Sequence, residues 1–424
     1  MTARFCYLLF LAGKSAWNRR GTLLLVAFSI ALSTTLLLGI EKIRTQIREN
    51  FVQAVSGTDL VVGARGGNIQ LMLYAVFHLG GATNNMGWRS AREIAGRPEV
   101  AWAIPVSLGD SHKGYPVVAT TTEFFAHYRF RGGRELSLAR GKAFASVFDV
   151  VVGAEAAKKL GYVVGQKLVL SHGSGGSHLT EHADKPFVVC GILAPTGTPV
   201  DRSLYIGLDA MEAIHLDWRG GAPMPGLRIL PEQVAKFDLE PKSITALLVG
   251  LKKRGQVFAL QRAVNEWKTE PLTGVMPGVV MDQIWSVVGV GEQALLFVSA
   301  LVTVAGLAGL AAAILAGLGE RRRELAILRS AGARPVNILI LLACEGFLIV
   351  TAGTVGGSVA LILLIAALGP TLADMYGIFI YLSPPDSGEW LLLGCICLAG
   401  ILTGLVPALR AYRMSLSDGL TVAI

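Results

Sequence analysis

The sequence is short of charge. Only 16% of its 424 residues are Asp, Glu, Lys or Arg, whereas 52% are hydrophobic. A soluble globular domain carries about 25% charged residues. The deficit is concentrated in four stretches long enough to cross a bilayer, which takes about 20 apolar residues. We predict membrane spans at residues 21–40, 290–319, 337–368 and 390–409.

Cysteine is also scarce. The chain has five, and only Cys190 lies in the long polar block between the first two spans, residues 41–285. An intrachain disulfide in that block is therefore excluded, and the block must be stabilised by its own hydrophobic core. Its length is ample for an independent domain.

Three further absences narrow the function. The membrane block is not repeated, which argues against a secondary transporter built from inverted repeats. No basic stripe with interleaved aromatic residues is present, so nucleic acid is not an expected partner. A phosphate-binding loop needs G-x-x-x-x-G-K-[ST]; "GKS" occurs at 13–15, but Leu8 replaces the first glycine. We therefore expect no ATP site and no catalytic residues in this chain.

Basic residues beside the spans predict the orientation, because Lys and Arg in short loops stay on the cytoplasmic side. They are frequent in residues 1–20, 320–336 and 410–424, and absent from residues 369–389. We predict cytoplasmic termini, a cytoplasmic loop at 320–336, a short external loop at 369–389 and an external domain at 41–285. Residues 1–20 read as an amphipathic helix at the inner surface.

The external block has an α+β pattern. Short apolar runs bounded by Gly and Pro alternate with helix-forming segments; "VVVGAEAAKKLGYVVGQKLVL" at 150–170, for example, predicts strand, helix, turn and strand. Residues 41–55 and 279–293 predict helical stalks that continue the first and second spans outward. The expected fold is an α-helical membrane protein with one span, a large extracytoplasmic α+β domain and three further spans.

The densest charge lies in the loop between the second and third spans, "GERRRELAILRSAGARP" at 319–335. Strong helix formers are followed by Gly332 and Pro335, which are typical of a helix end and a new start. Leu325 and Leu328 share one face of this short helix, so the segment is amphipathic. Arginines that only set the topology would explain the charge, but not the apolar face or the Gly and Pro.

This segment resembles the signature of the FtsX-like permeases, the MacB-like family of ABC transporter membrane subunits. Glu320–Ala333 matches the "ERRREIALLRALGA" type of segment after the second span. Residues 18–32, 150–170 and 187–193 are similar to the family's first span and outer domain, and the order of one plus three spans is also the family's.

The resemblance implies a dimer in which each permease contacts an ATP-binding subunit that carries ATP and Mg²⁺. ATP-driven motion would pass through the loop and the stalks to a periplasmic domain of a bacterial inner-membrane protein, exporting or extracting a lipid-linked, peptide or small-molecule cargo. A homodimer is expected, with a heterodimer and a periplasmic adaptor or binding protein as open alternatives. The residues expected to couple to the ATPase are Glu320, Arg321, Arg322, Arg323, Glu324, Leu325, Leu328, Arg329 and Gly332.

Histidine supplies a second candidate site. All seven histidines lie in the external block, and His172, His178 and His182 occur with Asp184 in one glycine-rich loop. Imidazole and carboxylate groups at short spacing suit zinc. A solvated polar loop is the alternative. A metal site would favour a second function for the chain, as a membrane-anchored sensor or handler of a metal or peptide.

Two further patterns are open to more than one interpretation. The glycine-rich apolar stretch at 57–86 is either a strand plus helix of the domain core or an apolar surface that binds cargo. Gly353 with Gly357, and Gly400 with Gly404, have the small-xxx-small spacing that lets membrane helices approach closely. Glu292 and Glu345, the two charges inside the predicted spans, are expected to have structural roles.

Overall fold

The structure is a computed structural model that describes residues 20–53, 57–80, 84–130, 133–173, 181–219, 222–224, 226–320, 327, 330, 333–376 and 382–413. The chain forms two compact units. One comprises Met1–Gln46 with Gly289–Ile424, and the other Ile47–Val288.

Four long apolar helices form the first unit: α2 (Arg20–Gln53), α9 (Pro277–Glu320), α11 (Pro335–Tyr376) and α12 (Ser387–Arg413). Each contains a segment long and apolar enough to span a membrane, namely Gly21–Gln46, Gly289–Ala316, Val336–Thr371 and Ser387–Val406. The prediction of four spans is confirmed. Both α2 and α9 continue without a break past their apolar segments.

The four helices pack through a small apolar core. Ile30 of α2, Leu310 of α9, Val350 of α11 and Ile396 of α12 are all buried in one cluster. Only 22–28% of the most apolar window of each helix is buried in the chain. Most of each apolar surface is thus left for lipid or another chain, as expected for a membrane-spanning unit.

Eleven strands of the second unit form one mixed sheet among the described residues. The path runs β17 (Leu272–Val275), β1 (Leu60–Ala64), β16 (Ala246–Leu251), β3 (Val100–His112), β4 (Tyr115–Thr120), β12 (Leu204–Gly207), β8 (Asp149–Val152), β11 (Phe187–Leu193) and β7 (Leu138–Gly141). Two short strands, β10 (Ser171–His172) and β9 (Lys167–Leu168), pair with β3 and β11.

Both faces of this sheet are covered. Because side chains alternate along a strand, Val150 and Val152 of β8 contribute to one core and Val151 to the other. Burial on both faces explains why the strands appear in the sequence as continuous apolar runs.

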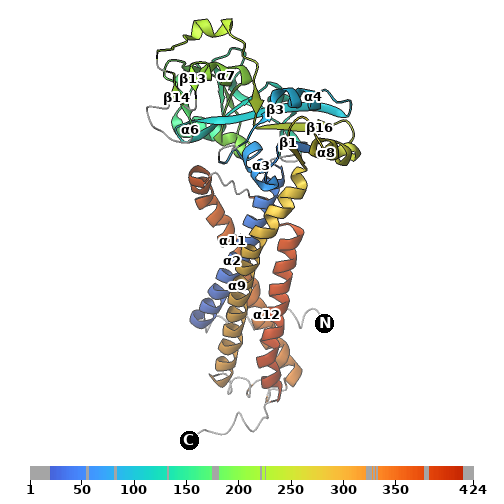
Figure 1. The fold of residues 1–424 in the computed structure, drawn as a ribbon. Coiled ribbons are helices and arrows are strands. Elements are labelled where there is room, and N and C mark those ends of the chain that lie inside the picture. The colour runs from blue at the N-terminus through green and yellow to red at the C-terminus, as the bar shows by residue number, and fades with distance from the viewer. Residues whose placement is uncertain are drawn as a thin grey trace. The chain divides into compact units, whose positions relative to one another are not determined.

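Short helices cover the two faces. One face carries α4 (Trp88–Ala95), α6 (Ala154–Leu160), α7 (Leu208–His215) and α8 (Val257–Asn265), and the other carries α3 (Asn68–Ala75) and α5 (Glu123–His127). Figure 1 shows α4 and α3 on opposite sides of the strands of this unit. The predicted large α+β domain is confirmed.

The order of elements at 150–170 is the predicted one, β8, α6 and then β9. The segment at 57–86 is a core strand followed by a helix: β1 is buried, and Leu71 and Met72 of α3 contribute to the core. This favours the core interpretation over the cargo surface.

Candidate metal centre

Four side chains from separate parts of the outer unit converge on one point. Asp110 lies on β3, His172 on β10, His182 shortly before β11, and His215 at the end of α7. Their potential ligand atoms all lie within 4.8 Å of one another. Three imidazoles and one carboxylate therefore form a single cluster.

Strand pairing positions the first two residues. Because β10 runs antiparallel to β3, Ser171 lies opposite Ser111 and His172 opposite Asp110. Directly opposed side chains point to the same face of a sheet. His172 Nδ1 accordingly lies 3.0 Å from Asp110 Oδ1.

A helix end positions His215. Its Nδ1–H donates a hydrogen bond to the carbonyl of Met211, one turn earlier in α7, at 2.8 Å. This bond leaves the lone pair of Nε2 directed away from the helix backbone. Nε2 lies 3.0 Å from His172 Nδ1 and 3.6 Å from Asp110 Oδ1.

His182, like Asp110, has a fully buried side chain. Its ring packs on the indole of Trp218, with the ring centroids 4.1 Å apart. Its Nε2 is 3.9 Å from Asp110 Oδ2, beyond hydrogen-bond distance. Both nitrogens of His182 and Oδ2 of Asp110 are buried without a hydrogen-bond partner among the described residues.

The charges of the cluster are coupled. Burial opposes ionisation of Asp110. The hydrogen bond to His172 and the nearby rings of His215 and His182 outweigh burial and lower the pKa of Asp110 to about 2. Burial lowers the pKa of His182 to about 4. Burial also disfavours protonation of His215, but the nearby Asp110 carboxylate and the carbonyl of Met211 favour it more strongly and raise its pKa. At neutral pH the cluster thus holds an ionised carboxylate and a neutral His182.

A buried ion pair supports the cluster. Lys185 Nζ lies 2.6 Å from Asp217 Oδ1 and 3.2 Å from Asp184 Oδ2, and the Lys185 side chain is fully buried. Asp217 Oδ2 also accepts a hydrogen bond from the backbone N–H of Ile229. Lys185 follows His182 by three residues and Asp217 follows His215 by two, so this pair ties together two of the segments that carry cluster residues.

The residues that the structure brings together differ in part from the metal ligands predicted from the sequence. It brings His172 and His182 together, but Asp184 pairs with Lys185 and is not in the cluster. His178 lies outside the described residues. Sequence reasoning missed Asp110 and His215 because they are distant along the chain, and no local pattern marks either residue.

The predicted coupling segment lies mostly outside the described residues. Glu320 ends α9. The other predicted coupling residues lie outside the described residues: Arg321, Arg322, Arg323, Glu324, Leu325, Leu328, Arg329 and Gly332. The predicted helix at 1–20, apart from Arg20, and the tail from 414 onward lie outside as well.

The paired glycines lie at helix contacts of the membrane unit. A Cβ at Gly353 would come 2.7 Å from Ile30 Cγ2, and one at Gly357 would come 2.5 Å from the carbonyl oxygen of Ala31, so α11 approaches α2 closely there. Gly400 of α12 faces Val350 of α11. Gly404 also lies on α12, where a Cβ would be 3.7 Å from the Cα of Gly346.

Ion pairs join three helices of the membrane unit. Arg44 of α2 binds Glu41 at 2.6 Å and Glu292 of α9 at 2.8 Å, while Lys42 binds Glu389 of α12 at 3.0 Å. Glu292 thus has a structural partner. Glu345 is buried in α11.

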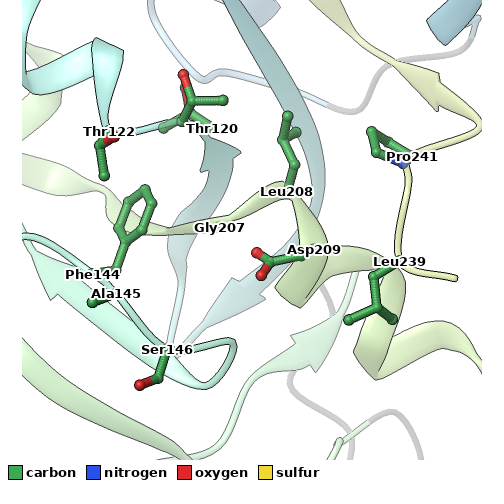
Figure 2. A pocket seen from close by; sticks show the side chains of 11 residues that line it. Thr120, Thr122, Phe144, Ala145, Ser146, Gly207, Leu208, Asp209, Leu239 and Pro241 are labelled. Atoms are coloured by element: carbon green, nitrogen blue, oxygen red, sulfur yellow. The ribbon is translucent and has the colours of Figure 1, made fainter. Parts of the chain in front are cut away.

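An open pocket of about 360 Å³ lies at the start of α7 (Figure 2). Figure 2 shows the carboxylate of Asp209 among the lining side chains, and its Oδ1 accepts a hydrogen bond from the N–H of Ala210. A carboxylate at the helix N-terminus disfavours a bound anion. The lining residues include no His, Cys or Lys to activate a nucleophile. We therefore place the candidate site at the histidine cluster.

Comparison with known proteins adds independent information. The model of the MacB-like periplasmic core domain matches residues 21–266, and the model of the FtsX-like permease C-terminal region matches residues 296–416. No curated protein matches the chain.

Two solved structures are similar to the outer part. The periplasmic region of MacB from Actinobacillus actinomycetemcomitans is 11% identical, with a TM-score of 0.34, and the match covers 54% of this chain and 92% of that one. The extracellular domain of the noncanonic ABC-type transporter YknZ from Gram-positive bacteria is 9% identical, with a TM-score of 0.31, and the match covers 51% and 99%.

Proposed function

Because the chain belongs to the FtsX-like permease family with a MacB-like periplasmic core domain, whose members are permease components of ABC transporters, we propose that it couples ATP hydrolysis on a separate subunit to motion of its outer domain. The work done would be the export or extraction of a lipid-linked, peptide or small-molecule cargo. The chain itself is not the catalyst. The ATP-binding partner supplies ATP and Mg²⁺.

The observation that supports this proposal most strongly is where the family matches fall. They cover residues 21–266 and 296–416, so the second match begins within the second apolar segment, Gly289–Ala316. The outer domain is thereby inserted between the first and second spans. Both α2 and α9 run continuously beyond their apolar segments, as helices that transmit motion must.

The charge pattern supports an orientation with the outer domain in the periplasm. The short connection between α11 and α12 has no Lys or Arg, whereas Arg321, Arg322 and Arg323 follow α9 directly. By the positive-inside rule, the arginine-rich segment then faces the cytoplasm, where an ATPase can reach it.

Capture of the ATPase by the intact protein tests the coupling. The chain is purified in mild detergent, and co-purifying ATP-binding proteins are identified by mass spectrometry. Replacing Leu325 and Leu328 by Ser removes the apolar face but keeps the arginines that set the topology. We expect this variant to lose the ATPase at an unchanged membrane level.

A second variant and its control test whether the arginines act through their planar guanidinium groups or through charge alone. Replacing Arg321, Arg322 and Arg323 by Lys keeps the topology signal but removes the planar guanidinium groups. The control is a chain in which Arg140 and Lys142, both in the outer domain, are replaced by Gln. This chain should capture the ATPase as the unaltered chain does. An ATPase retained equally by every variant would contradict the assigned contact, and no ATPase with the unaltered chain would contradict the proposed function.

A further inference from the structure

We propose that Asp110, His172, His182 and His215 bind one divalent transition-metal ion of the zinc class. This site differs from the one expected in the loop at 172–184. Two of its four ligands come from β3 and from the end of α7, and Asp184 is replaced by Asp110. It also goes beyond the coupling function, since the ion would bind in the outer domain whether or not an ATPase is attached.

The spacing of the donor atoms fits a tetrahedral ion. Zinc bonds of about 2.0–2.1 Å place tetrahedral donors about 3.3–3.4 Å apart. His172 Nδ1 lies 3.0 Å from both Asp110 Oδ1 and His215 Nε2, and His215 Nε2 lies 3.6 Å from Asp110 Oδ1. His182 Nε2 lies 3.9 Å from Asp110 Oδ2. These separations lie on both sides of the tetrahedral value, and one donor atom from each of the four residues lies within 4.8 Å of the others.

Hydrogen bonds within the described residues do not satisfy all the buried polar atoms of the cluster. Both nitrogens of His182 and Oδ2 of Asp110 are fully buried and unpaired among the described residues. A buried polar atom without a hydrogen-bond partner destabilises the folded state. One ion at the centre would satisfy a nitrogen of His182 and the Asp110 carboxylate together.

The surroundings hold the ligands as metal sites require. The hydrogen bond from His215 Nδ1 to Met211 fixes the tautomer that presents Nε2. Trp218 packs on His182, and the buried pair of Lys185 with Asp217 joins the segments that carry His182 and His215. These contacts orient the ligands before an ion arrives.

The donor set selects the kind of ion. Calcium and magnesium take oxygen ligands, six or more for calcium, whereas three imidazoles with one carboxylate suit zinc and its neighbours. Four protein ligands fill a tetrahedral shell and leave no position for a substrate. The ion would therefore be structural or sensory: it would join His172 and His182 to β3 and α7.

The test uses the full chain in detergent, without a histidine tag, stripped of metal and then titrated with Zn²⁺ by calorimetry. We expect one ion per chain. His182→Gln and Asp110→Asn should each weaken binding on the order of 100-fold, because loss of a direct ligand costs at least as much as loss of an outer-shell partner. His215→Gln, at a partly exposed position, covers the case in which a buried substitution prevents folding.

The matched control uses a described histidine outside the cluster. His127→Gln, at a half-exposed position of α5, should bind Zn²⁺ as the unaltered chain does. Co²⁺ in place of Zn²⁺ should give the strong visible absorption of a tetrahedral site. Two results would overturn the proposal. One is that the unaltered chain does not bind Zn²⁺, and the other is that His182→Gln, Asp110→Asn and His215→Gln all bind it with the affinity of the unaltered chain. Neither result would affect ATPase capture, so the two proposals can fail separately.

Discussion

His172 lies opposite Asp110 in the pairing of β10 with β3, and its Nδ1 is 3.0 Å from Asp110 Oδ1, although 62 residues separate them in the chain. Only the sheet register brings the two groups together. The end of α7 brings His215 Nε2 within 3.0 Å of His172 Nδ1, so the candidate metal centre depends on the folded outer domain.

Metal binding should stabilise the outer domain. A ligand that binds only the folded state adds roughly 2.7 kcal/mol at a free concentration 100 times its Kd. We expect Zn²⁺ to raise the unfolding temperature of the stripped protein and excess chelator to reverse the effect. Thermal unfolding followed by tryptophan fluorescence measures this, and Asp110→Asn should show no shift.

The Lys185–Asp217 pair should act as a positioning element. Lys185→Ala leaves Asp217 buried without its main charge partner, a change that typically costs about 3–5 kcal/mol. We expect a clear loss of stability together with Zn²⁺ binding about 10–100-fold weaker, as for outer-shell partners. Lys159→Ala, which removes a partner of the buried Glu155 in α6, is the control and should leave Zn²⁺ affinity unchanged. Unaltered Zn²⁺ affinity in Lys185→Ala would show that the pair does not position the ligands.

His78 should make the outer domain sensitive to acid. It is buried, its Nδ1 lies 2.8 Å from Ser203 Oγ, and burial lowers its pKa to about 4. The unfolded chain binds the proton near pH 6.5. Stability is therefore full above pH 6.5 and falls as the pH drops towards 4, by roughly 2 kcal/mol at pH 5.

The variant His78→Asn checks this assignment. Asparagine tolerates the left-handed backbone at this position (φ 52°) and does not titrate. The stability of the His78→Asn variant, measured by hydrogen exchange of the sheet, should fall less between pH 7 and pH 5 than that of the unaltered chain. Parallel pH curves for the two proteins would rule His78 out as the source.

Gly357 should be intolerant of a side chain. A Cβ there would lie 2.5 Å from the backbone oxygen of Ala31, so α11 would have to move away from α2. Gly357→Val should lower the thermal stability of the membrane unit in detergent. Gly394→Ala on α12, where nothing lies within 4 Å of the added carbon, is the control. Equal melting of both variants would contradict the close approach.

Much of the fold could be predicted from the sequence because its signals are local. Four apolar runs predict four spans, and the run at 150–170 predicts β8, α6 and β9 in order. The metal centre could be predicted only in part, since His172 and His182 share a loop. Asp110 and His215 join them through strand pairing and helix packing, which no local spacing encodes. Likewise, the Arg44–Glu292 pair links positions 248 residues apart.

The most direct test of the central claim follows the outer domain while the partner turns over ATP. One spin label is placed at Arg89, exposed on α4, and another at Ser387, exposed at the start of α12. Labelled chain is diluted into unlabelled chain, reconstituted with its ATPase in lipid, and the distance between the labels is measured with and without ATP. The account predicts a distance distribution that shifts on ATP binding and returns after hydrolysis. A distribution that stays unchanged while ATP is hydrolysed would contradict it.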